Sequence, residues 1–232
     1  MEPTQSLRSL NLYEILANLI PGSTLILIFV LVFRIENYIL LDGGAFLLAV
    51  FIIIALVLGH VIQAFASELE GTPVLFGTVI QISRGQKEED ESPIPITHVE
   101  RSFWPLMKRK FSLPEEFDNY GEMFRLLLSY VETTPATRAL HFQAVHSFHR
   151  SMWAVWHLAV GLSLLGIGAK FLGFGAVRPW QVLVIAVLGS IFGIRIFGQR
   201  KEKFNKLFIQ YAIVDFYSDQ VGEHKQSNRP AR

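Results

Sequence analysis

The stretch AFLLAVFIIIALVLGHVIQAFA, residues 45–66, decides the fold, because its 22 residues include no Asp, Glu, Lys or Arg. A transmembrane helix needs about 20 mostly apolar residues to cross a hydrocarbon core of about 30 Å. Three other runs are similarly apolar, at residues 15–33, 152–174 and 180–197. The sequence therefore predicts an all-α membrane protein with four transmembrane helices, arranged as two hairpins at residues 15–66 and 152–197.

The composition agrees with this class of protein. Hydrophobic residues make up 51% of the 232 residues and charged residues only 18%, whereas a soluble domain carries roughly a quarter charged residues. The absence of cysteine excludes disulfides, thiolate metal sites and cysteine nucleophiles. The formal net charge of +1 gives no reason to expect nucleic acid as a partner.

The distribution of Lys and Arg predicts the orientation of the spans. The two short loops and the adjoining end of the third span hold Arg34, Lys170 and Arg178, and most other basic residues lie in segments 1–14, 67–151 and 198–232. By the positive-inside rule, these three segments, and with them both termini, are expected in the cytoplasm. The run at 15–33 is expected to be an uncleaved anchor, because it is longer than a signal peptide's apolar stretch and a second span follows directly.

The central segment, residues 67–151, is expected to form a small cytoplasmic domain of helices. Thr97 and Glu100 have the spacing of a capping box, which predicts a helix through about Lys110. Ser112, followed by LPEE, predicts the cap of the next helix. The segment GTPVLFGTVIQIS, residues 71–83, is compatible with a short helix or a short strand. The charged run at 84–96 is typical of a solvated loop.

Two long helices are expected to extend from the second hairpin into the cytoplasm. Thr134-Pro135 starts a helix that meets no stop signal before Gly173, so it continues into the third span. Beyond the fourth span, basic and apolar residues alternate at helical spacing, which predicts an amphipathic helix within segment 198–232. Residues after Ser218 are expected to fray.

Polar side chains inside a span are candidates for function. His60 and Gln63 lie in the second span, where such groups face the bundle interior or an aqueous path. One interpretation is interhelical hydrogen bonding that fixes the packing, and the other is a pore or gate in an oligomer. In the first span, Asn18 and the Pro21-Gly22 pair predict a kink or a broken start of the helix.

Small residues mark two faces where helices can approach closely. Ala55 with Gly59, and Gly189 with Gly193, have the small-xxx-small spacing of packed membrane helices. For Gly189 and Gly193, self-association of two chains and packing within one chain are both open.

Metal and anion sites were sought among the histidines and the basic residues. His141, His146 and His149 are weak metal candidates, because together with His157 they spread over about 160° of the circumference of one helix. No cofactor is expected, and no phosphate loop, nucleophile elbow or zinc-protease motif supports catalysis. The candidates for binding anionic lipid or another anionic ligand are Lys108, Arg109, Lys110, Arg200, Lys201, Lys203 and Lys206.

The stretch YEILANLIPG, residues 13–22, resembles the start of the first span in a group of uncharacterised bacterial four-span membrane proteins. LGHVIQAFAS, residues 58–67, is similar to the end of their second span. Together the two stretches cover about a tenth of the chain. The resemblance implies a bacterial inner membrane and the context of phage-defence operons, in which such proteins are accessory or effector components.

These observations lead to a functional hypothesis. We expect a homo-oligomeric membrane effector or channel-like protein, gated by a small cytosolic signal or a protein partner. A non-conducting membrane scaffold that recruits a cytosolic partner is the alternative, and a membrane-embedded metalloenzyme is the third.

Overall fold

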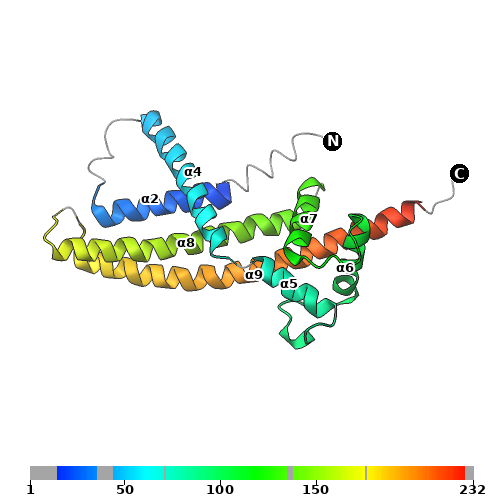
Figure 1. Ribbon diagram of the computed structural model, residues 1–232. Helices are drawn as coiled ribbons and strands as arrows, with labels where there is room; N and C mark the ends of the chain where they lie inside the picture. Colours follow the sequence, from blue (N-terminus) through cyan, green and yellow to red (C-terminus); the bar gives the residue numbers. More distant parts are fainter. Residues whose placement is uncertain (1–14, 36–43, 71, 135–137, 176, 228–232) are drawn as a thin grey trace. The chain divides into compact units, whose positions relative to one another are not determined.

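The computed structural model describes residues 15–35, 44–70, 72–134, 138–175 and 177–227. Every regular element in these ranges is helical, so the all-α prediction is confirmed (Figure 1). Three of the helices are long and apolar enough to cross a membrane, namely α4, α8 and α9. The elements in chain order are η1 (Ile15–Leu19), α2 (Ile20–Phe33), α4 (Gly44–Glu68), α5 (Thr72–Ser83), η2 (Glu89–Glu91), α6 (His98–Lys110), α7 (Tyr120–Thr133), α8 (Arg138–Phe171) and α9 (Trp180–Ser227).

The chain forms two compact units, and each draws on two separate stretches of sequence. Unit 1 comprises Met1–Glu70 and Ala144–Glu202, and unit 2 comprises Gly71–Gln143 and Lys203–Arg232. Helices α8 and α9 are continuous and contribute residues to both units. The predicted continuous helix into the third span is confirmed from Arg138 onwards, while its expected start at Thr134-Pro135 falls partly outside the described residues.

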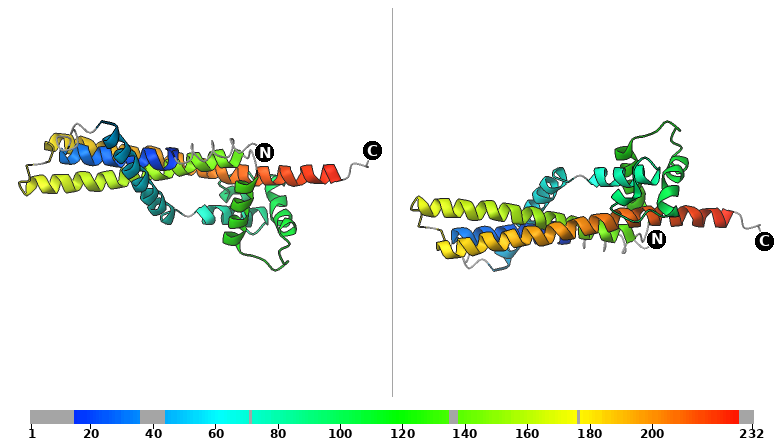
Figure 2. Two further views of the ribbon diagram at one scale, coloured as in Figure 1. Left: turned by 90° about the horizontal axis from the view of Figure 1, so that it is seen from above. Right: turned by 90° about the horizontal axis from the view of Figure 1, so that it is seen from below.

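Unit 1 is built on the hairpin of α8 and α9, which lie side by side in all three views (Figures 1 and 2). Helix α2 lies along this hairpin, where Val32 is buried against Val177 and Leu183. Helix α4 crosses α2 obliquely and packs Ile62 and Ala66 against α8. The apolar segment predicted as the first span begins with the π-helical turn η1, followed by Pro21 in the first turn of α2, so the predicted irregular start of this helix is confirmed.

Unit 2 is a helical domain around an aromatic core. Helices α5, α6 and α7 pack against the beginning of α8 and the second part of α9, and the fully buried side chains include Phe76, Phe103 and Phe216. The ring of Phe103 meets those of Phe76 and Phe216 edge to face, with centroids 5.9 and 5.5 Å away. Aromatic pairs with this geometry add about 0.5–1.5 kcal/mol beyond the area they bury.

The open choice for residues 71–83 is resolved as a helix, α5. Phe76, Val79 and Ile80 are all buried, and their spacing of three and four residues places them on one helical face. A strand would have sent neighbouring residues 79 and 80 to opposite faces. The capping box is also confirmed, because Thr97 accepts from the amide of Val99 and Glu100 accepts from the amide of Thr97.

The predicted helix cap at Ser112 is wrong. Ser112 has a φ of 51°, and the amide of Leu113 bonds back to the carbonyl of Lys108, so this turn closes α6 in the manner of a left-handed C-terminal cap. The next helix, α7, starts instead at Asn119, whose side chain accepts from the amide of Glu122 at 3.0 Å. Phe117 therefore lies in the loop before α7.

The expected fraying after Ser218 is also wrong, because α9 continues to Ser227. Tertiary packing explains the difference. Ile209, Ala212, Ile213 and Phe216 are buried in the core of unit 2, and Gln220 is buried one turn further on. A helix held by such contacts continues beyond the residue at which its local sequence predicts fraying.

Candidate functional site: a buried ionic cluster around Glu70

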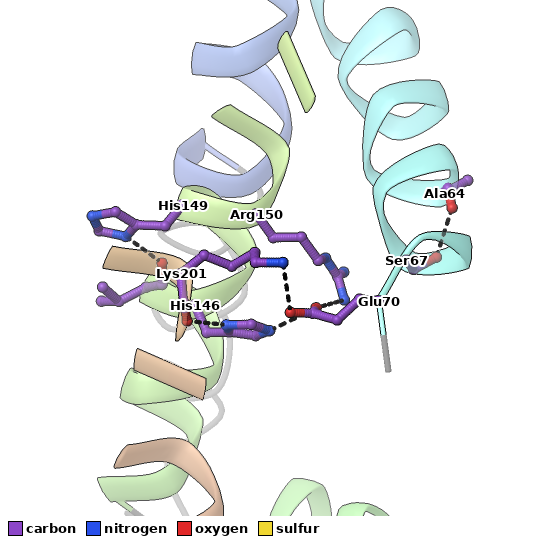
Figure 3. A network of polar contacts seen from close by, with 8 residues as sticks. Ala64, Ser67, Glu70, His146, His149, Arg150 and Lys201 are labelled. Atoms are coloured by element: carbon purple, nitrogen blue, oxygen red, sulfur yellow. Dashed lines mark hydrogen bonds and ion pairs between the residues drawn. The ribbon is translucent and has the colours of Figure 1, made fainter. Parts of the chain in front are cut away.

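A single buried carboxylate gathers three basic side chains from two helices. Glu70 follows the end of α4, and its Oε2 lies 3.0 Å from Nε2 of His146 and 3.2 Å from Nη1 of Arg150, both on α8 (Figure 3). Nζ of Lys201, on α9, lies 3.6 Å from Oε1 of the same carboxylate. All four residues belong to unit 1, and we call them the Glu70 cluster.

The cluster is shielded from solvent. The side chains of His146 and Glu70 are 4% and 6% exposed, and those of Arg150 and Lys201 are 14% and 15% exposed. Burying charges is costly unless they are paired and hydrogen-bonded. Removing any one partner therefore leaves the others in a poor environment, which makes the cluster sensitive to its geometry.

Glu70 stays ionised well below neutral pH. Burial by itself raises the pKa of a carboxyl group, but here the hydrogen bond and charge of His146 and the charges of Arg150 and Lys201 outweigh it and lower the pKa of Glu70 to about 2. Nδ1 of His146 lies 3.1 Å from the carbonyl oxygen of Lys201. Both ring nitrogens of His146 thus face oxygen atoms, one of Glu70 and one of the backbone.

The cluster holds more positive than negative groups. Lys201 also makes a cation–π contact with Trp153, because the centroid of that ring lies 4.5 Å from Nζ. Nε of Arg150 is buried and has no hydrogen-bond partner within the described residues. One carboxylate therefore holds together helices that would otherwise repel each other at this level.

The position of the cluster along the chain is informative. The chain passes from one unit to the other after Glu70, before Ala144 and after Glu202. Each of these crossings lies within two residues of a member of the Glu70 cluster, namely Glu70 itself, His146 and Lys201. The ion pairs therefore hold together the three segments of unit 1 that are continuous in sequence with unit 2.

Sequence reasoning found only half of this cluster. His146 was considered as a metal ligand and Lys201 as a ligand for anions, whereas Glu70 and Arg150 were missed. The available signal was Glu70 itself, an acid placed directly after an apolar span and two residues beyond Glu68. Nothing in the spacing indicated that its partners are about 75 and 130 residues away.

The three histidine candidates are not brought together. His141 is exposed in unit 2, His146 is bound to Glu70, and Nδ1 of His149 lies 2.8 Å from the carbonyl of Val145 in its own helix. Among the residues that the structure describes, no group of three His, Cys, Asp or Glu side chains has the arrangement of a metal site.

His60 and Gln63 have different environments. His60 is exposed on α4, and its Nδ1 lies 2.9 Å from the carbonyl of Leu56 one turn earlier. Its neighbours Val57 and Val61 are 59% and 60% exposed, so His60 lies on an apolar outer face of unit 1. Gln63 is half-buried and engaged in an interaction.

Ala55 and Gly59 lie where two helices are in backbone contact. A Cβ added to Gly59 would lie 2.0 Å from the carbonyl oxygen of Asn18, and one added to Gly22 would lie 1.8 Å from that of Ala55. Only glycine allows α4 to approach η1 and the start of α2 this closely.

The two glycines of the second pair, Gly189 and Gly193, have different surroundings. Gly193 is buried against Trp156 of α8, where an added Cβ would come within 2.4 Å of the indole ring. Gly189 is exposed, with open space around the position of a Cβ. Gly193 therefore serves packing within the chain, and only Gly189 is left on an outer surface.

The other basic candidates are spread over both units. Lys108 lies over the ring of Trp104 and donates to the carbonyl of Glu115. Arg109 lines a groove in unit 2. Exposed positions are occupied by Lys110, Arg200, Lys203 and Lys206.

Comparisons of the chain with models of known protein families, with curated proteins and with solved structures give no match.

Proposed function

We propose that this chain is a four-span effector of the bacterial inner membrane, in which unit 2 receives a cytosolic signal and α8 and α9 transmit it to the membrane. The observation that carries the proposal is that both helices are continuous and belong to both units. Any change in unit 2 that moves its parts of α8 or α9 acts on the same rigid helices that form the apolar hairpin of unit 1.

The packing of unit 2 supports a hairpin that enters and leaves the membrane on one side. The core of unit 2 joins residues before α8, such as Phe76, to residues late in α9, such as Phe216. These two stretches flank residues 144–202. A chain whose ends meet in one compact unit must cross the bilayer an even number of times in between.

The first span is shorter than the others, but η1 and α2 together run through 19 residues, from Ile15 to Phe33. At about 1.5 Å per residue they are roughly 28 Å long, close to the thickness of a hydrocarbon core. This length supports a fourth span beside α4, and the charge distribution supports placing both termini and unit 2 in the cytoplasm.

The exposure of His60 supports assembly into a homo-oligomer. In a single chain, its ring lies on an apolar face that would be in contact with lipid. Polar groups within membrane spans almost always find a protein or water partner. Nδ1 of His60 already faces the carbonyl of Leu56, and a second copy, or an aqueous path between copies, supplies a partner for the other ring nitrogen. This is the basis of the pore or gate interpretation of His60 and Gln63.

The Glu70 cluster suits a gate because it holds α4 to α8 and α9 beside every crossing into unit 2. A signal that shifts α8 against α9 in unit 2 changes how His146, Arg150 and Lys201 meet Glu70. In a defence system, the expected result of opening is loss of membrane integrity or potential, under the control of a cytosolic partner or small ligand.

The topology can be tested directly, because the natural chain has no cysteine. Single variants Ser9→Cys, Lys87→Cys and Gly175→Cys are expressed in bacteria and labelled in spheroplasts with a membrane-impermeant maleimide. Four spans with cytoplasmic termini predict labelling of the Gly175→Cys variant alone. Labelling of Ser9→Cys from outside would indicate three spans, and labelling of Lys87→Cys would reverse the orientation.

Gating is tested by membrane potential in cells and by ion flux from proteoliposomes. We expect the Glu70→Gln variant to depolarise cells at an expression level at which the natural chain and Glu68→Gln do not. A monomer in nanodiscs, with unchanged potential for all three proteins, would contradict the effector function. A stoichiometric cytosolic partner without any flux would favour the scaffold instead.

A further inference from the structure

We propose that unit 2 carries a binding groove for a phosphate-bearing small molecule with a flat apolar part, of the nucleotide type. The groove lies between α6 and the last turns of α9, and its volume is about 470 Å³. Pockets for small ligands measure about 300–1,000 Å³. This inference rests on the proposed function, because it names the class of signal that unit 2 would receive.

One face of α6 and one face of α9 form the walls of the groove. Arg101, Pro105 and Arg109 lie four residues apart along α6, and Tyr217 and Val221 lie four residues apart on α9. This spacing places each set on a single helical face. The opposite face of α6 holds Phe103 and Met107 in the core, and Leu106 lies at the border between the core and the groove.

The charge of the groove selects an anion. Two arginines line it, and the described lining residues include no Asp or Glu. The planar guanidinium presents paired donors that match phosphate oxygens, which is why arginine predominates in phosphate sites. Arg101 and Arg109 are about 12 Å apart along the helix axis, at 1.5 Å per residue, so they can hold an elongated polyphosphate from both ends.

The space between the two arginines is suited to a flat apolar group. Pro105 and Leu106 line it from α6, and the ring of Tyr217 lines it from α9. The ring of Tyr217 is steadied by the edge-to-face contact with His98, at a centroid distance of 6.2 Å. Ser102 adds a hydroxyl group to the same wall. Aromatic and apolar walls with a few polar groups are typical of sites for small ligands.

An acidic segment of the same chain already engages one end of the groove. Glu89, in the short helix η2, forms an ion pair with Arg101. Both partners are more than half exposed, so this pair is easily broken. We infer that Glu89 competes with the phosphate for Arg101, which would keep the affinity for the ligand low and reversible.

The experiment measures binding to the full chain in nanodiscs of zwitterionic lipid, by calorimetry with ATP, GTP and inorganic triphosphate. We expect saturable binding of at least one nucleotide. The Arg101→Ala/Arg109→Ala variant should bind it about tenfold or more weakly. Arg125→Ala, which removes the same charge from the exposed side of α7, is the matched control and should bind as the natural chain does.

The Glu89→Gln variant gives a result in the opposite direction. If Glu89 competes for Arg101, its neutralisation should strengthen nucleotide binding several-fold, whereas a merely structural role would weaken it or leave it unchanged. Inorganic triphosphate should bind more weakly than the nucleotide, because it cannot fill the apolar part of the groove.

Several outcomes would overturn the proposal. They are no saturable nucleotide binding by the natural chain or by Glu89→Gln, equal weakening by Arg125→Ala, and triphosphate binding as tight as that of the nucleotide. Binding of anionic lipid that depends on Arg101 and Arg109, without binding of nucleotide, would also overturn it. Calorimetry is independent of topology and ion flux, so a failure here is distinguishable from a failure of the proposed effector function.

Discussion

Units 1 and 2 both contain large apolar side chains but use them in opposite ways. Unit 2 buries its largest side chains, such as Phe76, Phe103 and Phe216, completely. Unit 1 exposes residues of the same kind: Phe46 is 74% exposed, Ile185 67% and Phe192 66%. Many of its buried positions are small or polar, such as Ala55 and Asn18, beside a few larger side chains such as Ile62.

This difference shows which forces stabilise each unit. Burial of apolar area from water stabilises unit 2 by about 25 cal/mol per Å². In a bilayer the lipid chains are as apolar as leucine, so unit 1 depends on close backbone packing and on specific polar contacts. The predictions below perturb one unit at a time, in order of expected effect.

The largest effect is expected from Phe103→Ala in unit 2. The ring is fully buried between Phe76 and Phe216, so its loss should cost about 3–5 kcal/mol through the lost contacts and the cavity. Hydrogen-exchange mass spectrometry in nanodiscs should show faster exchange in α6 and the end of α9. The matched control Phe46→Ala, on the outside of α4, should leave exchange in unit 2 unchanged. Equal effects of both variants would contradict the contrast between the units.

The next largest effect is expected from Glu70→Gln in unit 1. The amide keeps the shape but leaves Arg150 and Lys201 buried without a counter-charge, at a cost of about 3 kcal/mol. Thermal unfolding in nanodiscs measures it, and exposed Glu68→Gln is the control. Adding Lys201→Met to Glu70→Gln should restore part of the stability. If the double variant were less stable than Glu70→Gln, the account of excess positive charge would be wrong.

Gly59→Ala should have a smaller effect, of about 1–3 kcal/mol, because the methyl group forces α4 away from the backbone of Asn18. The comparison variant is Gly189→Ala, where the added methyl group meets open space. Alanine is the better helix former, so this variant should be as stable as the natural chain or slightly more stable. Equal losses at the two positions would mean that helix contact is not the cause.

The smallest effect under ordinary conditions is the pH dependence that comes from Glu70. Its pKa is lowered from about 4.5 to about 2 in the folded chain, so its contribution to stability is fully present above pH 4.5 and is lost as the pH falls through 2. The free energy of unfolding should fall at no more than about 1.4 kcal/mol per pH unit in this window on account of this group. Between pH 6 and pH 8, Glu70 should add no slope. The Glu70→Gln variant should lack the acid-dependent component, and an unchanged acid profile would assign it to other carboxylates.

The sequence correctly predicted those features of the fold that depend on local sequence patterns. Apolar run length gave the long helices, the spacing of Thr97 and Glu100 gave the capping box, and the lack of a stop signal before Gly173 gave the continuity of α8. Ser112 was misread because a serine before Leu-Pro-Glu-Glu looks like an N-terminal cap, while its role depends on how α6 ends.

Local sequence patterns could not predict the contacts between distant segments. Glu70 and Lys201 are separated by more than half of the chain, and no local feature of either one identifies the other. The same is true of the groove, because the sequence marks Arg109 only as one of several basic residues and has no local feature that singles out Tyr217. Even a correct list of helices leaves open which of their faces meet.

The discontinuity of unit 2 has a consequence for the order of synthesis. Its first stretch, Gly71–Gln143, leaves the ribosome before the second hairpin, and the remaining part of its core, including Phe208, Ile213 and Phe216, comes from the last stretch of the chain. Domains generally fold as units. Unit 2 must therefore wait, incomplete, until residues 144–202 have been made. A chain that stops before residue 203 leaves Phe76 and Phe103 without the part of their core that Phe208, Ile213 and Phe216 supply.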